Sequence, residues 1–420
     1  MKRIIILTIK KAHHHIVTPI RMFLQDSRAV GIILIICTVL SLLFANLNFS
    51  AEAYTSFFLM HLPALTDGLN LPENPLSIVN DVLMTFFFFL VALEIKRELT
   101  VGELASIKRS LLPVLAALGG MICPALIFAV FNSTSQFSHG WGIPMATDIA
   151  FSLGVLSLLG KKVPVQLKIF LAALAIIDDL GAIVTIAIFY TSSLHWIYLF
   201  CGLGLIGLVI LLNVLKIKQS FIYFIPAVGL WYCLFNSGIH PTISGVIMAF
   251  AMPSAMLENI QKILYYPVNF VIMPLFALAN TAIILPSHFG DVFTSTISFG
   301  IMLGLVAGKP LGIFMFCFIA TKLGIAHMPS RSNYTQLLGI GMLGGIGFTM
   351  SIFTSTLAYD TNQLQIISKV AIICASVVSS IAGYMYLNRK EVTQPQIKHV
   401  EKKKIKPSFF ITKEHVAATA

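Results

Sequence analysis

The chain has 420 residues, of which 57% are hydrophobic and only 11% are charged, and its formal net charge is +11. A soluble domain carries about 25% charged residues. Together with a mean hydropathy of +0.89, this composition excludes a soluble globular protein and indicates a polytopic membrane protein. The six cysteines are isolated in apolar runs, which indicates neither a disulfide framework nor a zinc site.

Apolar runs of roughly 20 residues, the length that crosses a bilayer as a helix, predict an all-α fold with about twelve transmembrane spans. The seventh and eighth of these runs are unusually short for a span. In chain order the predicted spans are 29–48, 77–98, 110–131, 140–160, 164–190, 195–215, 221–235, 238–253, 264–285, 296–320, 335–357 and 365–388.

Lysine and arginine are distributed asymmetrically between the predicted loops. They occur in the N-terminal stretch 1–28, in alternate loops and in the tail 389–420, whereas the other loops contain none: 49–76, 132–139, 191–194, 236–237, 286–295 and 358–364. Cytoplasmic loops carry an excess of these residues, so both termini are predicted to be cytoplasmic and the number of spans even. The positive charge then reflects topology and not nucleic-acid binding. The basic tail is expected to be disordered and solvated, or drawn to anionic lipid.

Polar residues and glycines interrupt the fourth and eleventh spans. The fourth contains Pro144, Thr147 and Asp148, and the eleventh has five glycines between Gly339 and Gly347. Proline and glycine both disfavour a continuous helix. Paired interruptions in the two halves of a chain indicate a transporter binding site. The alternative is that the glycines only let helices pack closely.

The fifth span contains two adjacent aspartates, Asp178 and Asp179, and the tenth contains Lys309. A charge at the bilayer centre costs about 2.5–3.5 kcal/mol on insertion scales, so intramembrane ionisable residues usually have a function. Two neighbouring buried carboxylates do not both ionise cheaply and titrate as a unit. A carboxylate binds a hard cation or a proton but not both, which predicts competition between the two at this pair.

Several long strings of this chain resemble those of NhaA-type sodium/proton antiporters. They begin at Asn80-Asp81 and Leu93–Leu99, continue through Ala146–Phe151 and Lys168–Ile183, and end with Gly308–Gly312 and Gly345–Phe353. The resemblance runs in order from about residue 25 to 388. It implies inverted repeats, formed by spans three to five and ten to twelve, in which spans four and eleven are broken helices that cross.

The resemblance also implies roles for the polar residues inside the spans. Asp179 becomes the principal cation ligand and proton acceptor, and Asp178 is its partner, ion-paired with Lys309. Asp148 and Thr147 contribute to the cation site, and Asp148 balances the positive ends of the half-helices. The family further implies exchange of cytoplasmic sodium or lithium for external protons, with two protons per sodium, and a homodimer in the bacterial inner membrane. No resident cofactor is expected.

The resemblance places a response to pH at Glu94, Glu98 and His240. For the two glutamates an ordinary solvated ionic network is the alternative, and His240 is equally interpreted as an interfacial histidine. Asp81 is interpreted either as lining an outer funnel or as marking the entry of its helix. The start of span nine departs from the family pattern, because 261–267 lacks the acidic residue and the two histidines found there. A strong pH switch built from those groups is therefore not expected.

Two other functions are considered. An intramembrane aspartyl protease is disfavoured, because neighbouring residues point about 100° apart on a helix and the motifs of such proteases are missing from this sequence. A sodium-coupled symporter for an organic anion needs a cationic recognition site, and Lys309 is the only midplane cation near the motif strings. Lys369, in the last span, is expected to snorkel or to pair locally.

Overall fold

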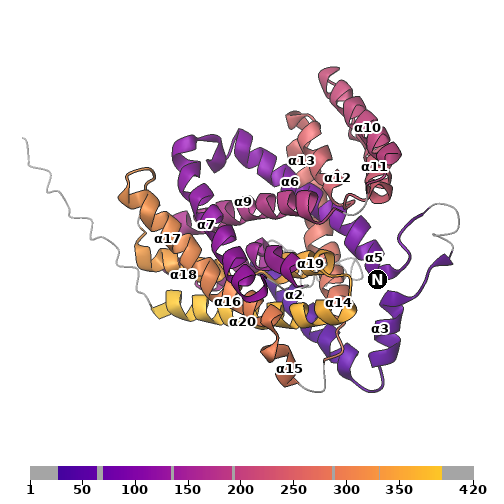
Figure 1. Ribbon diagram of the computed structural model, residues 1–420. Coiled ribbons are helices and arrows are strands. Elements are labelled where there is room, and N and C mark those ends of the chain that lie inside the picture. The colour runs from indigo at the N-terminus through magenta and orange to yellow at the C-terminus, as the bar shows by residue number, and fades with distance from the viewer. Residues whose placement is uncertain are drawn as a thin grey trace, which may run out of the picture.

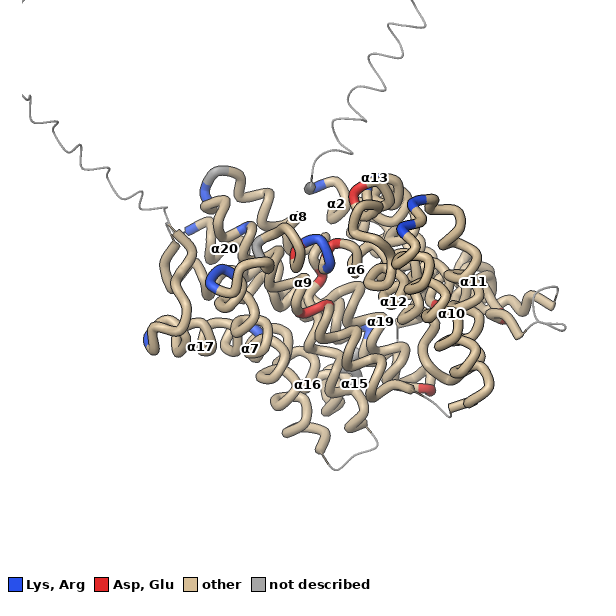
Figure 2. The backbone as a smooth tube through the Cα atoms, turned by 90° about the horizontal axis from the view of Figure 1, so that it is seen from above, with Lys and Arg blue, Asp and Glu red and all other residues tan. Residues whose placement is uncertain are grey.

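The computed structural model describes residues 27–63, 70–133, 137–191, 194–285, 289–330 and 332–389. The predicted terminal segments 1–28 and 389–420 lie outside these ranges apart from residues 27, 28 and 389. The described residues are helical and contain no strand (Figure 1). Figure 2 shows that most of the backbone carries neither acidic nor basic residues.

The helices that form single spans match the predicted spans within a few residues at most ends. In the first half they are α2 (Ser27–Asn46), α6 (Met84–Thr100), which is preceded by α5 (Pro75–Ser77) and a π-helical turn (Ile78–Leu83), α7 (Ile107–Asn132), α9 (Val165–Phe189), α10 (Trp196–Val214) and α11 (Ser220–Ser237). In the second half they are α13 (Leu257–Pro267), which continues through a π-helical turn (Val268–Ile272) into α14 (Met273–Asn280), then α16 (Thr296–Leu303), which continues through Gly304–Gly308 into α17 (Lys309–Lys322), and α20 (Asn362–Arg389). Two short helices, α3 (Ala51–Leu59) and α15 (Phe289–Thr294), lie in loops.

The two interrupted segments are helical on either side of a break. In the first, a 3-10 helix (Ser138–Met145) is separated by residues 146–148 from α8 (Ile149–Leu158). In the second, α18 (Tyr334–Gly344) and α19 (Phe348–Ala358) are bent by 47° at residues 345–347. That these segments cross a membrane as broken spans stays a prediction.

Ten described segments are long and apolar enough to cross a membrane, or eleven if the bent pair is counted. The predicted span 238–253 accounts for the difference from twelve. Within it only α12 (Ile243–Ala251) is helical, and its nine residues rise about 14 Å, less than half of the roughly 30 Å of a bilayer core. Gly238 ends α11 with a φ of 90°, and Pro241 and Pro253 bracket α12. The count of twelve therefore stays a prediction.

The ninth span begins about ten residues earlier than the predicted 264–285, because the chain is helical and apolar enough from Ser254 to Asn280. The side chains of Glu258 and Lys262 are more than 75% exposed and form an ion pair, while Leu257 and Ile260 on the same helix are buried. This two-faced first turn lowers the mean hydropathy of the segment. The apolar run in the sequence therefore begins about ten residues after the start of the helical segment.

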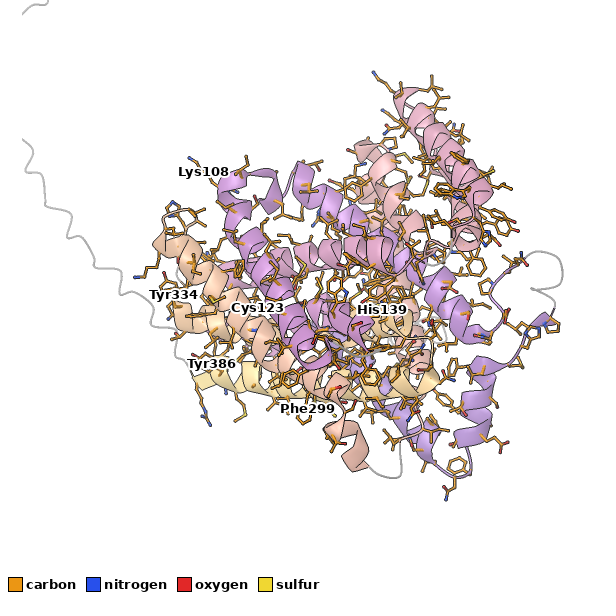
Figure 3. The ribbon with its side chains drawn as sticks, in the orientation of Figure 1. Lys108, Cys123, His139, Phe299, Tyr334 and Tyr386 are labelled. Atoms are coloured by element: carbon orange, nitrogen blue, oxygen red, sulfur yellow. The ribbon has the colours of Figure 1, made fainter. Side chains whose placement is uncertain are left out.

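The core lies around α9, which runs through the middle of the molecule in both views (Figures 1 and 2). In contrast, α10 lies at the edge and exposes large apolar side chains, among them Ile197 (78% exposed) and Phe200 (66%). Such a surface suits lipid and not water. Side chains fill the spaces between the central ribbons (Figure 3).

Candidate functional site

The two breaks lie against each other in the protein core. The backbone N–H of Asp148 donates to the carbonyl of Ile346 at 2.7 Å, and the hydroxyl of Ser351 donates to the carbonyl of Ile143 at 2.8 Å. Thr147 Oγ1 lies 2.8 Å from the carbonyl oxygen of Gly344. Backbone groups that the breaks release from helical hydrogen bonding therefore find partners across the contact, as buried backbone groups must.

Asp148 joins the N-terminal ends of both half-helices. Its Oδ1 accepts from the backbone N–H of Phe151 at 2.9 Å and so caps α8. Its Oδ2 accepts from the backbone N–H of Thr349 at 3.1 Å, in the first turn of α19, and from the Thr349 hydroxyl at 2.5 Å. A carboxylate is favoured at a helix N-terminus by free N–H groups and by the helix dipole. The buried Asp148 side chain therefore binds the N-terminal ends of both α8 and α19.

Asp178 is bound on one oxygen by two groups. Its Oδ2 lies 3.0 Å from Lys309 Nζ, at the first residue of α17, and 2.7 Å from Thr147 Oγ1. Lys309 also donates to the carbonyl of Met145. Both charged side chains are fully buried. A buried ion pair is stable only with such additional hydrogen bonds.

Asp179, the next residue of α9, is 1% exposed and lies apart from this network. Its Oδ1 has no hydrogen-bond partner among the described residues, and the same is true of Asp178 Oδ1. A buried carboxylate oxygen without a partner is costly. The arrangement therefore leaves oxygen atoms available for a ligand, and oxygen is the donor that a hard cation prefers.

A cavity of about 450 Å³ reaches Asp179. Asp179, Asp148 and Thr349 line one part of it, together with apolar residues of α2, α6, α8 and α9. Glu94, Arg97 and Glu98 of α6 also line it, and the Arg97 side chain is 45% exposed. Asp178, Thr147 and Lys309 are not among the lining residues. The cavity therefore separates the predicted site residues into two groups.

The predicted pH-responsive glutamates both face the cavity, but their partners differ. Glu94 accepts a hydrogen bond from the side chain of Gln261 at 3.3 Å, and Glu98 pairs with Arg97 at 3.0 Å. Lys96 pairs with neither glutamate, because its Nζ donates to carbonyls at the end of α12, among them that of Phe250 at 2.9 Å. The partner of Glu94 is thus an amide, which does not titrate.

Asp81 and His240 lie together, outside the lining of that cavity. His240 Nε2 is 3.4 Å from Asp81 Oδ1, and its Nδ1 is 2.8 Å from Thr242 Oγ1. Asp81 belongs to the π-helical turn before α6, a feature frequent at functional sites. Sequence reasoning considered the two residues separately. Lys369 is 7% exposed in α20 and forms no ion pair with a described residue.

Sequence reasoning did not single out Thr349 and Ser351. Both lie directly after the glycine run of the eleventh span, within a string quoted for the resemblance. Hydroxyl residues that follow a glycine-rich break are a usable signal, because the break exposes backbone groups that such side chains can bind. Their partners, Asp148 and Ile143, lie about two hundred residues earlier in the chain.

Comparison with known proteins identifies the family. A family model described as "Na+/H+ antiporter 1" matches residues 21–387. The chain belongs to this family. It is 48% identical over 373 residues to "Na(+)/H(+) antiporter NhaA 2" of Flavobacterium johnsoniae, covering 87% of this chain and 91% of that protein. It is 43% identical over 379 residues to "Na(+)/H(+) antiporter NhaA" of Citrobacter koseri, covering 88% and 97%.

Membership of the antiporter family extends over the whole candidate site. The matched range contains Asp178 and Asp179 on α9, both breaks and Lys309, whereas the basic tail after residue 389 lies beyond it. Together with the membrane-length helices, the family and its bacterial members establish a multi-pass bacterial membrane transport protein.

Proposed function

We propose that this protein exchanges cytoplasmic sodium or lithium for external protons, by competition of cation and proton at Asp179. Family membership supports sodium/proton antiport in general. The observation that carries the specific proposal is a buried carboxylate with an unpartnered oxygen, on a residue that lines a cavity together with Asp148 and Thr349. Proton and metal ion share the same lone pairs, so one excludes the other.

Asp178 and Lys309 act in this proposal as the charge partner of Asp179. Lys309 balances the negative charge of Asp178 at 3.0 Å, so this pair adds no net charge beside the cation or proton at Asp179. Thr147 orients Asp178, and Asp148 holds the two half-helix ends together. The sodium ion is cargo, and no resident metal or organic cofactor is invoked.

Two protons per sodium make the exchange electrogenic. One net charge then moves inward per cycle, and each charge gains about 2.3 kcal/mol in a potential of 100 mV. The proposal includes an inner-membrane location with both termini cytoplasmic, as the Lys and Arg pattern suggests. It also includes a homodimer, which rests on the family resemblance.

A sodium-coupled symporter for an organic anion has less support. Arg97 is the only basic side chain among the residues that line the cavity, and it is paired with Glu98. Lys309 is not among the lining residues and is paired with Asp178. The relatives reported above carry antiporter names.

The test is proton flux in proteoliposomes on addition of sodium, lithium, potassium or choline. Wild type is expected to respond to sodium and lithium only, and Asp179→Asn to none, because an amide neither ionises nor carries the exchanged proton. Asp360→Asn is the matched control, since Asp360 is exposed in the loop between α19 and α20. Sodium-evoked flux in a folded Asp179→Asn variant would overturn the proposal.

A further inference from the structure

Two threonine hydroxyls lie beside the buried aspartates, but only one of them borders the cavity. Thr349 lines the cavity together with Asp148 and Asp179. Thr147, which sequence reasoning assigned to the cation site, is not among the lining residues. Its hydroxyl lies between Asp178 Oδ2 at 2.7 Å and the carbonyl of Gly344 at 2.8 Å.

We propose that Thr349 Oγ1 is a ligand of the transported cation, together with Asp179 and Asp148, when the cavity is open as it is here. This inference rests on the proposed antiport and adds a residue to the cation site. In this arrangement Thr147 belongs to the Asp178–Lys309 network and acts as a positioning residue.

The chemistry of a hydroxyl permits both contacts of Thr349 at once. A threonine hydroxyl has one O–H donor and two acceptor lone pairs. At 2.5 Å from Asp148 Oδ2 the Thr349 hydroxyl donates to a carboxylate, and such charge-assisted hydrogen bonds are short and strong. Donation polarises the oxygen and leaves its lone pairs for a cation in the cavity. The Thr147 hydroxyl already lies between two oxygen atoms, and Thr147 is not among the residues that line the cavity.

The position of Thr349 places an oxygen where the cation would otherwise meet apolar side chains. Thr349 is 1% exposed and is held in the first turn of α19, where its own backbone N–H is bound to Asp148. Thr349 is therefore fixed by two contacts to one carboxylate, one from its backbone N–H and one from its hydroxyl. A fixed neutral oxygen beside two carboxylates gives a cation three donors without adding negative charge.

The experiment measures the sodium KM and the maximal rate of exchange in proteoliposomes for Thr349→Val and Thr349→Ser. Loss of one oxygen ligand weakens the binding of the cation, so Thr349→Val is expected to raise the sodium KM on the order of tenfold or more. Thr349→Ser retains the hydroxyl and is expected to restore most of the affinity. Thr354→Val is the matched control, because that hydroxyl bonds to the Met350 carbonyl in the same helix and Thr354 is not among the lining residues.

A second readout separates a ligand from a residue that only positions Asp148. A lost ligand changes the ratio of the lithium and sodium KM values, because the two ions differ in size. A general weakening of the site raises both values by the same factor. An equal rise for both ions, a wild-type KM in Thr349→Val, or no rescue by Thr349→Ser would each overturn the inference.

Two further variants complete the test. Thr349→Ala replaces Thr349→Val if the valine variant does not elute as a folded species in size-exclusion chromatography. Asp179→Asn is measured in parallel. If Asp179→Asn is inactive while Thr349→Val has a wild-type KM, the ligand assignment fails and the antiport proposal stands. If Asp179→Asn is active, the antiport proposal fails.

Discussion

Lys309 and Asp178 are two fully buried charges whose nitrogen and oxygen are 3.0 Å apart. Removing one partner of such a pair leaves an uncompensated buried charge and costs about 3–5 kcal/mol, whereas replacing both is often neutral. We therefore expect Lys309→Met and Asp178→Asn each to lower the melting temperature, and the double variant to recover most of it. Thermal unfolding in detergent measures this.

The control for these variants is the exposed pair Glu258–Lys262, whose nitrogen and oxygen are 3.7 Å apart on the surface of α13. Surface pairs contribute roughly 0–1 kcal/mol, so Glu258→Gln is expected to leave the melting temperature nearly unchanged. If the Lys309 and Asp178 single variants melt like Glu258→Gln, the buried pair does not support the fold.

Gln261 is a neutral partner for Glu94 at the cavity, which also has Arg97, Glu98 and Tyr265 in its lining. A histidine at this position titrates near pH 6.5. In Gln261→His the introduced imidazole is charged below that pH and repels the cation, so the ratio of its sodium KM to that of wild type rises as pH falls. Above about pH 8 the imidazole is neutral and its KM approaches that of wild type. Proton flux between pH 6 and 9 tests this.

The matched variant for that pH effect is Gln261→Leu, which removes the same hydrogen bond without adding a titrating group. Its KM is expected to differ from wild type by the same factor at every pH. Parallel pH profiles for the histidine and leucine variants would show that no charge at position 261 acts on the cation.

The packing of α7 on α17 depends on close contact between two helix backbones (Figure 1). A Cβ atom added to Gly312 would lie 2.1 Å from the carbonyl oxygen of Gly119, and one added to Gly119 would lie 2.3 Å from that of Gly312. Backbone cannot yield as a flexible side chain can. Gly312→Ala is therefore expected to separate α7 from α17 and to displace Lys309 at the start of α17.

The measurement for Gly312→Ala is the yield of monodisperse protein and its melting temperature, with sodium-evoked flux as the functional readout. All three are expected to fall. Gly204→Ala, in the middle of α10, is the control because nothing lies within 4 Å of the added Cβ. Equal behaviour of the two variants would mean that the helices tolerate the extra methyl group by a small shift.

The elements of this fold differ in how far the sequence predicts them. Long apolar runs locate α2, α7, α9 and α20 well, because bilayer thickness sets both length and composition. The region 238–253 is less certain for a physical reason: its helical part, α12, packs on α6, where Gly245 approaches the carbonyl of Thr85, so its apolar residues do not by themselves indicate a span. Burial in protein and burial in lipid select the same side chains.

The residues of the candidate site also differ in how far the sequence predicts them. A carboxylate or ammonium in an apolar run is visible in the sequence, so Asp178, Asp179 and Lys309 can be proposed without a structure. Asp81 and His240 can each be proposed as well, but their contact cannot, and the glycine-rich break before Thr349 indicates a hydroxyl without identifying its partner. Only the tertiary contact between distant breaks gives Thr349 its carboxylate partner.

At the scale of the whole molecule, the remaining question is its orientation in the bilayer. The loops rich in Lys and Arg are predicted to be cytoplasmic, so the loop after α10 faces inward and the segment after α3 faces outward. Two exposed residues in the left-handed conformation mark these loops, Lys216 with a φ of 57° and Asn70 with a φ of 43°. Arg97, which lines the cavity, lies toward the inward side in this orientation.

A membrane-impermeant maleimide applied to intact spheroplasts distinguishes the two sides. Asn70→Cys is expected to be labelled at once, and Lys216→Cys only after the membrane is permeabilised, with wild type giving the background of the six native cysteines. Labelling of Lys216→Cys alone would show the opposite orientation, in which both termini and the Arg97 end of α6 face outward. Labelling of both in intact spheroplasts would mean an even number of crossings between residues 70 and 216, which contradicts the five spans predicted between them.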